Sequence, residues 1–277
     1  AIKRYFPIFV LPTMIAFTLG FIIPFVEGVY LSFCKFTTVN DAKFIGFANY
    51  AKVFADETFV HAFWYTAAFT VVSVILINVL AFAVALLLTK GFKGTNIFRT
   101  VFFMPNLIGG IVLGYIWQLL LNGILMNFSR TLTYSSTYGF WGLIVLMCWQ
   151  QIGYMMIIYI AGIQNIPGEL IEAAEIDGAT KWQILKKVTI PMVMPSITVC
   201  TFLTLTNSFK LFDQNLALTN GEPSKMSEML ALNIFNTFYG RTGYEGVGQA
   251  KAVIFFILVT VIALTQNYLT RRKEVQQ

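Results

Sequence analysis

The sequence predicts an all-α integral membrane protein with six transmembrane helices, and three observations lead to that fold class. Hydrophobic residues make up 57% of the 277 residues and charged residues only 12%, against about 25% charged residues in a typical soluble domain. The mean hydropathy is +0.71. Half of the chain lies in six stretches without a charged side chain, each between 19 and 27 residues long. About 20 apolar residues in a helix cross a hydrocarbon layer of roughly 30 Å, so each stretch can span a membrane.

The six stretches are the expected transmembrane helices of a single domain over residues 1–277. In chain order they are residues 5–26, 63–89, 100–121, 138–164, 188–209 and 252–270. In the third stretch Pro105 favours a kink, and Gly110 and Gly114 allow another helix to approach closely. Pro191 and Pro195 break or kink the entry to the fifth stretch. No small-residue cleavage site follows the first stretch, so we expect it to be a span and not a signal peptide.

The charge distribution predicts which side of the membrane each connection occupies. Six spans put both ends of the chain on one side, together with residues 90–99 and 165–187. That side holds 11 cations and 5 acids, whereas the other side holds 8 of each. Connections rich in Lys and Arg lie in the cytoplasm, so we expect both termini there. The net charge of +6 therefore reflects topology and contact with anionic lipid headgroups, and we expect no nucleic-acid partner.

Two long segments, residues 27–62 and 211–251, are expected on the outer side. Within the first, apolar residues between Phe44 and Phe59 recur at helical spacing, which indicates a helix that lies along the membrane surface or packs on neighbouring helices. His61, the single histidine, is expected in a solvated loop. The three cysteines are far apart in the sequence, and their spacing indicates neither a metal site nor a disulfide framework.

The longest cytoplasmic connection, residues 165–187, predicts two short helices joined by a turn. Pro167 can begin the first helix, and Glu169 and Glu172 lie early in it, where carboxylates suit the positive end of the helix dipole. Gly178 can end it in a left-handed conformation. A second helix is expected from about Thr180. The pair would lie along the inner membrane surface and expose an acidic, alanine-rich face to a partner.

The same connection resembles the EAA loop of bacterial ABC-importer permeases. The resemblance rests on Glu172-Ala173-Ala174, Asp177-Gly178-Ala179, Ile190-Pro191 and Pro195, whose spacing is similar to that of the carbohydrate-uptake group that includes the maltose permease subunits. Residues 103–106, 212–213 and 218–223 are similar to the same group. The resemblance covers roughly residues 44–252. Leu185 stands where the family often has Phe, and Glu222 where Gly is usual.

This resemblance implies the fold of maltose-permease-like type I ABC importers, with a cytoplasmic coupling helix between helices 4 and 5. It also implies a second homologous permease subunit, a cytoplasmic ATPase dimer, an extracytoplasmic solute-binding protein and a place in the bacterial cell membrane. The residues that would couple to the ATPase are Glu172, Ala173, Ala174, Asp177, Gly178, Ala179 and Pro191. The chain has no Gly-x-x-x-x-Gly-Lys-Ser/Thr loop. We therefore expect no catalytic residue, metal or cofactor here, and ATP with Mg²⁺ on the ATPase.

Polar side chains within the spans are candidates for a substrate path. They are costly in a bilayer and usually face a bundle interior or cavity. Amides both donate and accept hydrogen bonds, which suits a sugar, and the resemblance puts Gln150, Gln151 and Tyr154 at contact positions. The full candidate set is Tyr115, Gln150, Gln151, Tyr154, Asn207, Lys210 and Asp213. Alternatively, the amides hold helices together, and Lys210 and Asp213 form an ion pair at the water boundary.

The sequence thus favours an importer permease for a sugar or oligosaccharide, and it leaves other functions open. An importer for a polyol or glycerol phosphate would use similar residues. An ion-coupled secondary transporter needs a ligand for its coupling ion, but no carboxylate lies in any of the six stretches. A membrane enzyme would need acids, histidines or thiols that converge, and the stretches contain no histidine and only two cysteines.

Overall fold

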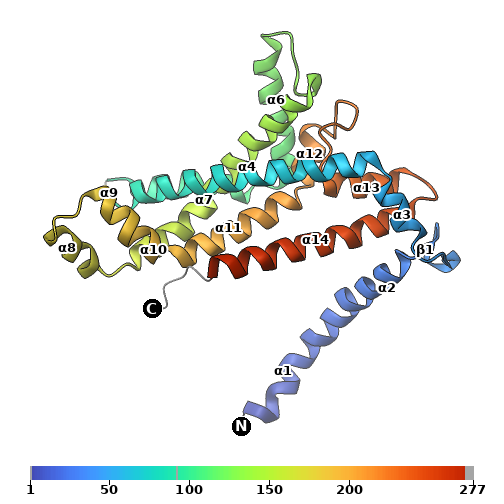
Figure 1. The fold of residues 1–277 in the computed structure, drawn as a ribbon, viewed down its shortest axis with the longest axis horizontal. Helices are drawn as coiled ribbons and strands as arrows, with labels where there is room; N and C mark the ends of the chain where they lie inside the picture. The colour runs from blue at the N-terminus through green and yellow to red at the C-terminus, as the bar shows by residue number, and fades with distance from the viewer. Residues whose placement is uncertain (1, 92, 272–277) are drawn as a thin grey trace. The chain divides into compact units, whose positions relative to one another are not determined.

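The computed structural model describes residues 2–91 and 93–271, which form helices joined by short connections (Figure 1). The chain separates into two compact units. The first comprises Ala1–Val60 and Asn233–Ile257, and the second comprises His61–Leu232 and Leu258–Gln277. Three helices contribute residues to both units: α4 (Glu57–Leu88), α13 (Leu230–Gly240) and α14 (Glu245–Arg271). The single transmembrane domain stays a prediction.

The first unit begins with three consecutive helical segments and a small two-stranded sheet. Its elements are α1 (Ile2–Phe17), the π-helix η1 (Thr18–Ile22), α2 (Ile23–Leu31), β1 (Cys34–Lys35), the 3₁₀ turn η2 (Val39–Asp41), β2 (Lys43–Phe44), α3 (Ala48–Phe54), α13 (Leu230–Gly240) and the start of α14 (Glu245–Arg271). The strands pair antiparallel, with Cys34 opposite Phe44. Leu31, Cys34 and Phe36 form a small apolar core beside Phe238 of α13. The surface helix expected between Phe44 and Phe59 corresponds to α3.

The second unit contains the main apolar core. Its elements are α4 (Glu57–Leu88), α5 (Thr95–Phe103), η3 (Met104–Leu107), α6 (Gly110–Met126), η4 (Leu132–Tyr134), α7 (Ser136–Gln164), α8 (Gly168–Ile176), α9 (Lys181–Ile184), η5 (Leu185–Thr189), α10 (Ile190–Met192), α11 (Met194–Phe209), α12 (Asp213–Leu218) and the end of α14. Helix α7 lies at the centre of this core. In the most apolar 18-residue stretch of α7, 61% of the residues are buried. Met155, Met156 and Tyr159 are among its fully buried side chains.

Contacts of α7 fix the directions of its neighbours. The ring of Phe140 packs on Tyr65, and farther along Tyr159 donates to Asn78 Oδ1 at 2.7 Å, so α4 and α7 run parallel. Cys200 Sγ lies 3.7 Å from the Met155 carbonyl, and Asn207 lines a cavity with Gln151. These two contacts make α11 antiparallel to α7. Alternating directions are typical of a chain that crosses a membrane repeatedly.

Within the described residues, four helices are long and apolar enough to cross a membrane. They are Ile8–Leu31, Glu57–Leu88, Ser136–Gln164 and Glu245–Arg271. The two remaining expected spans are bent helix pairs, so six spans result only if each pair is counted as one. Thr95–Leu107 and Gly110–Met126 meet at 103°, and Lys181–Met192 and Met194–Phe209 meet at 69°. The chain therefore turns within the third expected stretch, residues 100–121, just after Pro105, where a kink was expected.

Two residues expected in outer loops lie inside helices. His61 belongs to α4 and its Nε2 lies 3.0 Å from the Met226 carbonyl oxygen, so it is a half-buried helical residue and not a loop residue. Lys251 belongs to α14, which begins seven residues before the expected start at Ala252. The helix can include this lysine because its ammonium is buried against polar partners, including Asp56.

Candidate functional site

The connection between α7 and α11 folds into a two-helix bracket, residues 167–184, which we call the α8–α9 bracket (Figure 1). Helix α8 ends in a Schellman motif. Gly178 N–H donates to the Glu175 carbonyl and Ala179 N–H donates to the Ala174 carbonyl, both at 3.0 Å. Gly178 has φ +75°, a conformation that side chains with a Cβ disfavour. The expected left-handed turn at this glycine is confirmed.

Helix α9 begins directly after this turn with a capping box. The Gln183 backbone N–H donates to Thr180 Oγ1 at 3.3 Å, and the Thr180 N–H donates to Gln183 Oε1 at 2.7 Å. These two bonds satisfy backbone donors at the helix start. The bracket therefore has a defined turn, and the two helix ends that meet at it, the end of α8 and the start of α9, are both capped.

The outer face of the bracket combines carboxylates with exposed apolar side chains. Glu172 and Asp177 are exposed. Ile176 is 86% exposed and Trp182 is 69% exposed. A large apolar side chain that stays in water costs free energy, so these residues favour a face that a partner covers. Pro191 lies half-buried in α10, ahead of the 69° bend.

Within the second unit a polar cavity of about 290 Å³ lies between α7 and the end of α11. Gln151, Asn207, Lys210 and Asp213 line it, which brings together four of the seven residues in the predicted substrate path. The other lining residues are Met147, Leu211, Phe212 and Gln214. Among the described residues, the side chains of Lys210 and Asp213 are not within ion-pair distance of each other. The ion pair considered as the alternative for these two residues is therefore not formed.

Gln151, which lines this cavity, has a buried side-chain oxygen without a partner in the described part of the chain. Its side chain is 8% exposed, and none of the described groups donates to its Oε1. Buried polar atoms almost always have a partner. Gln151 lies 15 residues after the first residue of α7 and 13 before the last, which is about 20 Å from either end. A residue that lines the cavity thus carries a buried acceptor without a partner among the described groups, near the middle of an apolar helix.

The three other predicted residues lie outside the cavity lining. Gln150 is held by protein groups, because its Oε1 accepts from Gln214 Nε2 at 2.8 Å and its Nε2 donates to the Ile108 carbonyl at 3.4 Å. Tyr154 packs on Phe103, with ring centroids 6.4 Å apart. Tyr115 is 55% exposed on α6. These contacts fit the alternative interpretation of Gln150, in which its amide group holds helices together.

Sequence reasoning missed Gln214 as a cavity residue. It follows Asp213 at the start of α12, a short helix that the apolar pattern did not reveal. Helix α12 packs closely on α6, since a Cβ on Gly114 would lie 2.5 Å from the Ala217 Cβ. The close approach expected at Gly110 and Gly114 therefore occurs, and it positions Gln214 beside Gln150.

The apolar spanning helices, the bracket and the mid-helix polar cavity define a multi-pass membrane transport protein. Residues 77–275 match the family described as the inner membrane component of binding-protein-dependent transport systems, and the chain belongs to that family.

Relatives and solved structures agree with this family. The chain is 42% identical to a probable starch degradation products transport system permease of Thermoanaerobacterium thermosulfurigenes, over 97% of this chain and 94% of the relative. It is 27% identical to a trehalose/maltose transport system permease of Thermococcus litoralis, over 90% and 88%. The fold is similar to a bacterial alginate ABC transporter solved with an alginate-pentasaccharide-bound periplasmic protein, with a TM-score of 0.81 and 22% identity over 98% and 96%.

Proposed function

We propose that this chain is a permease subunit of an ATP-driven ABC importer that moves a neutral sugar or oligosaccharide across the bacterial inner membrane. The observation that carries the proposal is the polar cavity lined by Gln151, whose buried Oε1 has no partner among the described groups. Support also comes from relatives whose names refer to starch degradation products and to trehalose and maltose. A sugar hydroxyl would donate to Gln151, and the amides of Asn207 and Gln214 would both donate and accept.

The charges of the cavity favour a neutral solute over a phosphorylated one. Lys210 and Asp213 both line it, so one formal positive and one formal negative charge are present. A glycerol phosphate would bring an anion that Asp213 repels and that Lys210 alone would have to balance. Sugar hydroxyls can accept from the ammonium and donate to the carboxylate, so both groups are used.

The α8–α9 bracket is our candidate for coupling to the ATPase. Its exposed Ile176 and Trp182 would pack on a cytoplasmic ATPase subunit, with Glu172 near a basic residue of that subunit. ATP hydrolysis would move the bracket, and the bracket would move α7 and α11, between which it lies in the chain. ATP and Mg²⁺ would bind the ATPase, and this chain would need no cofactor of its own.

We also propose partners for the other surfaces of the chain, from the exposure of their residues and from the expected membrane topology. In the most apolar 18-residue stretch of Ile8–Leu31, no residue is buried. We therefore propose that a second homologous permease subunit and lipid cover this helix. The segments 27–62 and 211–251 would face the outer side and contact a solute-binding protein. Both termini would lie in the cytoplasm, in line with the charge asymmetry of the connections.

Replacing Gln151 tests the cavity. Gln151→Met keeps the side-chain length and removes the acceptor, so we expect sugar uptake into proteoliposomes to fall about fivefold, the equivalent of one hydrogen bond of about 1 kcal/mol. Gln118→Met is the matched control, because Gln118 lies on α6, outside the cavity, and donates to the Leu218 carbonyl. Equal uptake by wild type and Gln151→Met, with ATPase activity unchanged in both, would contradict the substrate role.

Replacing Gly178 tests the bracket. Gly178→Asp, like Glu172→Lys, should abolish ATP-driven uptake while the variants still assemble with their partners. Gly91→Asp is the matched control, because Gly91 has φ +72° and the variant carries the same backbone strain of about 1–2 kcal/mol in a different turn. If Gly91→Asp abolished uptake as fully as Gly178→Asp, the loss would reflect strain in general, and the coupling role of the bracket would be rejected.

A further inference from the structure

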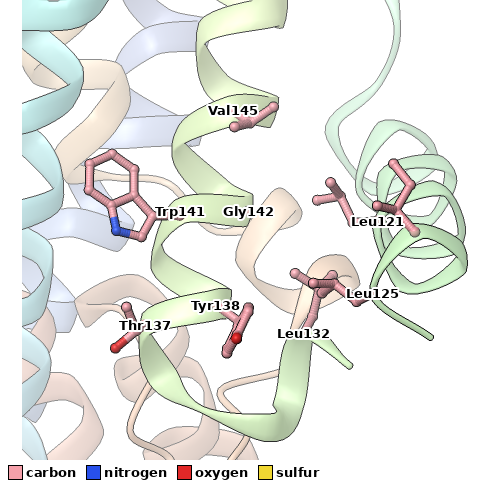
Figure 2. A pocket seen from close by; sticks show the side chains of 9 residues that line it. Leu121, Leu125, Leu132, Thr137, Tyr138, Trp141, Gly142 and Val145 are labelled. Atoms are coloured by element: carbon pink, nitrogen blue, oxygen red, sulfur yellow. The ribbon is translucent and has the colours of Figure 1, made fainter. Parts of the chain in front are cut away.

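A second cavity in the second unit is apolar and lies between α6 and α7. Its volume is about 310 Å³, at the lower end of the roughly 300–1,000 Å³ typical of ligand pockets. Figure 2 shows Leu121 and Leu125 of α6 across the cavity from Val145 of α7, with Leu132 and Tyr138 beside them. Such a lining offers almost no hydrogen bonds to water or to a sugar, and it suits a hydrocarbon chain.

The cavity lies at the end of α7 that is remote from the α8–α9 bracket. Its lining from α7 begins at Thr137 and ends at Val145, within the first ten residues of a helix that reaches the bracket after Gln164. Tyr134 is 62% exposed and Trp141 is 52% exposed in this region. Exposed Tyr and Trp residues at the end of an apolar helix are typical of the boundary between hydrocarbon and headgroups.

A cation is held at the rim of this cavity. Arg130 Nη1 donates to the Tyr138 hydroxyl, and Tyr138 lines the cavity. The guanidinium also lies over the ring of Tyr134, 5.2 Å from its centroid, and 5.7 Å from the Tyr138 centroid. In the described part of the chain no carboxylate comes within ion-pair distance of Arg130. Since a guanidinium has five N–H donors, most remain available for an oxyanion, and Arg binds phosphate groups in a bidentate manner.

We propose that this cavity binds a phospholipid from the leaflet opposite the bracket, with one acyl chain between α6 and α7 and the phosphodiester on Arg130. The arrangement joins an apolar space to a cation at the water boundary, which matches the two parts of a phospholipid. A free phosphate would leave the apolar space unfilled. A helix of a second subunit would cover the lining residues, but it would need an acidic side chain of its own at the position of Arg130.

Retention of lipid by variants tests the proposal. The full chain, purified with the subunits that accompany it, is reconstituted with phosphatidylglycerol, exchanged into detergent and weighed by native mass spectrometry. Wild type should retain one phospholipid for each copy of this chain. Arg130→Gln should reduce that occupancy about fivefold, and Val145→Phe, which fills the cavity, should reduce it at least as much. Arg241→Gln is the control, because Arg241 also lies over a tyrosine ring, 5.9 Å from the Tyr244 centroid, away from this cavity.

A cross-linking measurement identifies the occupant without relying on the stability of the variants. A photoreactive residue replaces Ile124, which lines the cavity and is 59% exposed. An adduct with the mass of phosphatidylglycerol supports the proposal. An adduct to another polypeptide would overturn it in favour of a subunit interface. Unchanged lipid retention by both Arg130→Gln and Val145→Phe would overturn it as well.

Discussion

Lys251 is the residue whose environment the sequence least reveals. Its side chain is fully buried, and its ammonium donates to Asp56 Oδ2 at 2.7 Å, Asn233 Oδ1 at 2.8 Å and Thr237 Oγ1 at 2.9 Å. A charge counts against a membrane span in any hydropathy pattern, which is why the predicted span began after it. The partners come from positions 14 to 195 residues away in the sequence, so no local pattern could have revealed them.

Removing one member of this buried pair should cost more than removing both. Asp56→Ala leaves a buried ammonium without its counter-ion, and we expect a loss of about 3 kcal/mol in stability. The double variant Asp56→Ala/Lys251→Met replaces the pair with apolar groups and should recover most of that loss. Thermal denaturation of the purified chain in detergent measures both. A double variant that is less stable than Asp56→Ala would contradict the reading of Lys251 as a charge that Asp56 neutralises.

The same pair predicts a dependence of stability on pH. Burial would raise the pKa of Asp56, but the hydrogen bonds from Lys251 and Thr58 outweigh it and lower the pKa to about 2. A carboxyl group with a lowered pKa stabilises the folded state above its unfolded pKa of about 3.9. That contribution should decline as the pH falls from about 4 to about 2. The free energy of unfolding should therefore depend less on pH over this range in Asp56→Asn than in wild type. Equal slopes of this free energy against pH in the two proteins would contradict the lowered pKa of Asp56.

At the scale of elements, the helices were predictable but their bends were not. Uninterrupted apolar runs are enough to identify α4, α7 and α14. The sequence also indicated breaks at Pro105 and Pro191, yet the angles of 103° and 69° depend on packing against neighbouring helices. The α8–α9 bracket was predictable in detail, because Gly178 and the Thr180–Gln183 capping box act over a few residues. The cavity lining was only half predicted, since α12 reaches it from a segment with no apolar pattern.

The contact between α5 and α7 depends on a glycine. A Cβ on Gly153 would lie 1.8 Å from the Phe102 carbonyl oxygen, so the two helix backbones meet there. Gly153→Ala should therefore separate α5 from α7 and destabilise the protein by about 1–3 kcal/mol. Gly123→Ala is the control, because no atom outside its own helix lies within 4 Å of a Cβ at that position. Equal melting temperatures for the two variants would show that α5 and α7 do not pack this closely.

At the scale of the whole molecule, low charge predicted a membrane protein, and the few charges predicted its orientation. The 19 cations and 13 acids are unevenly divided between the connections. Four of the acids, Glu169, Glu172, Glu175 and Asp177, fall in or beside α8. The identity of the sugar was not predictable, because a few amides and one pair of opposite charges suit many polyhydroxy compounds.

The most direct test of ATP-driven import is uptake by proteoliposomes that contain this chain with the ATPase and the second permease subunit that we propose as its partners. The solute-binding protein loaded with radiolabelled maltodextrin is added outside, and ATP is enclosed on the side that carries the bracket, as determined by protease accessibility of residues 165–187. We predict uptake that requires both the binding protein and ATP on the bracket side, and that Gly178→Asp abolishes. Uptake driven by an ion gradient without ATP, or by ATP on the opposite side, would contradict the account.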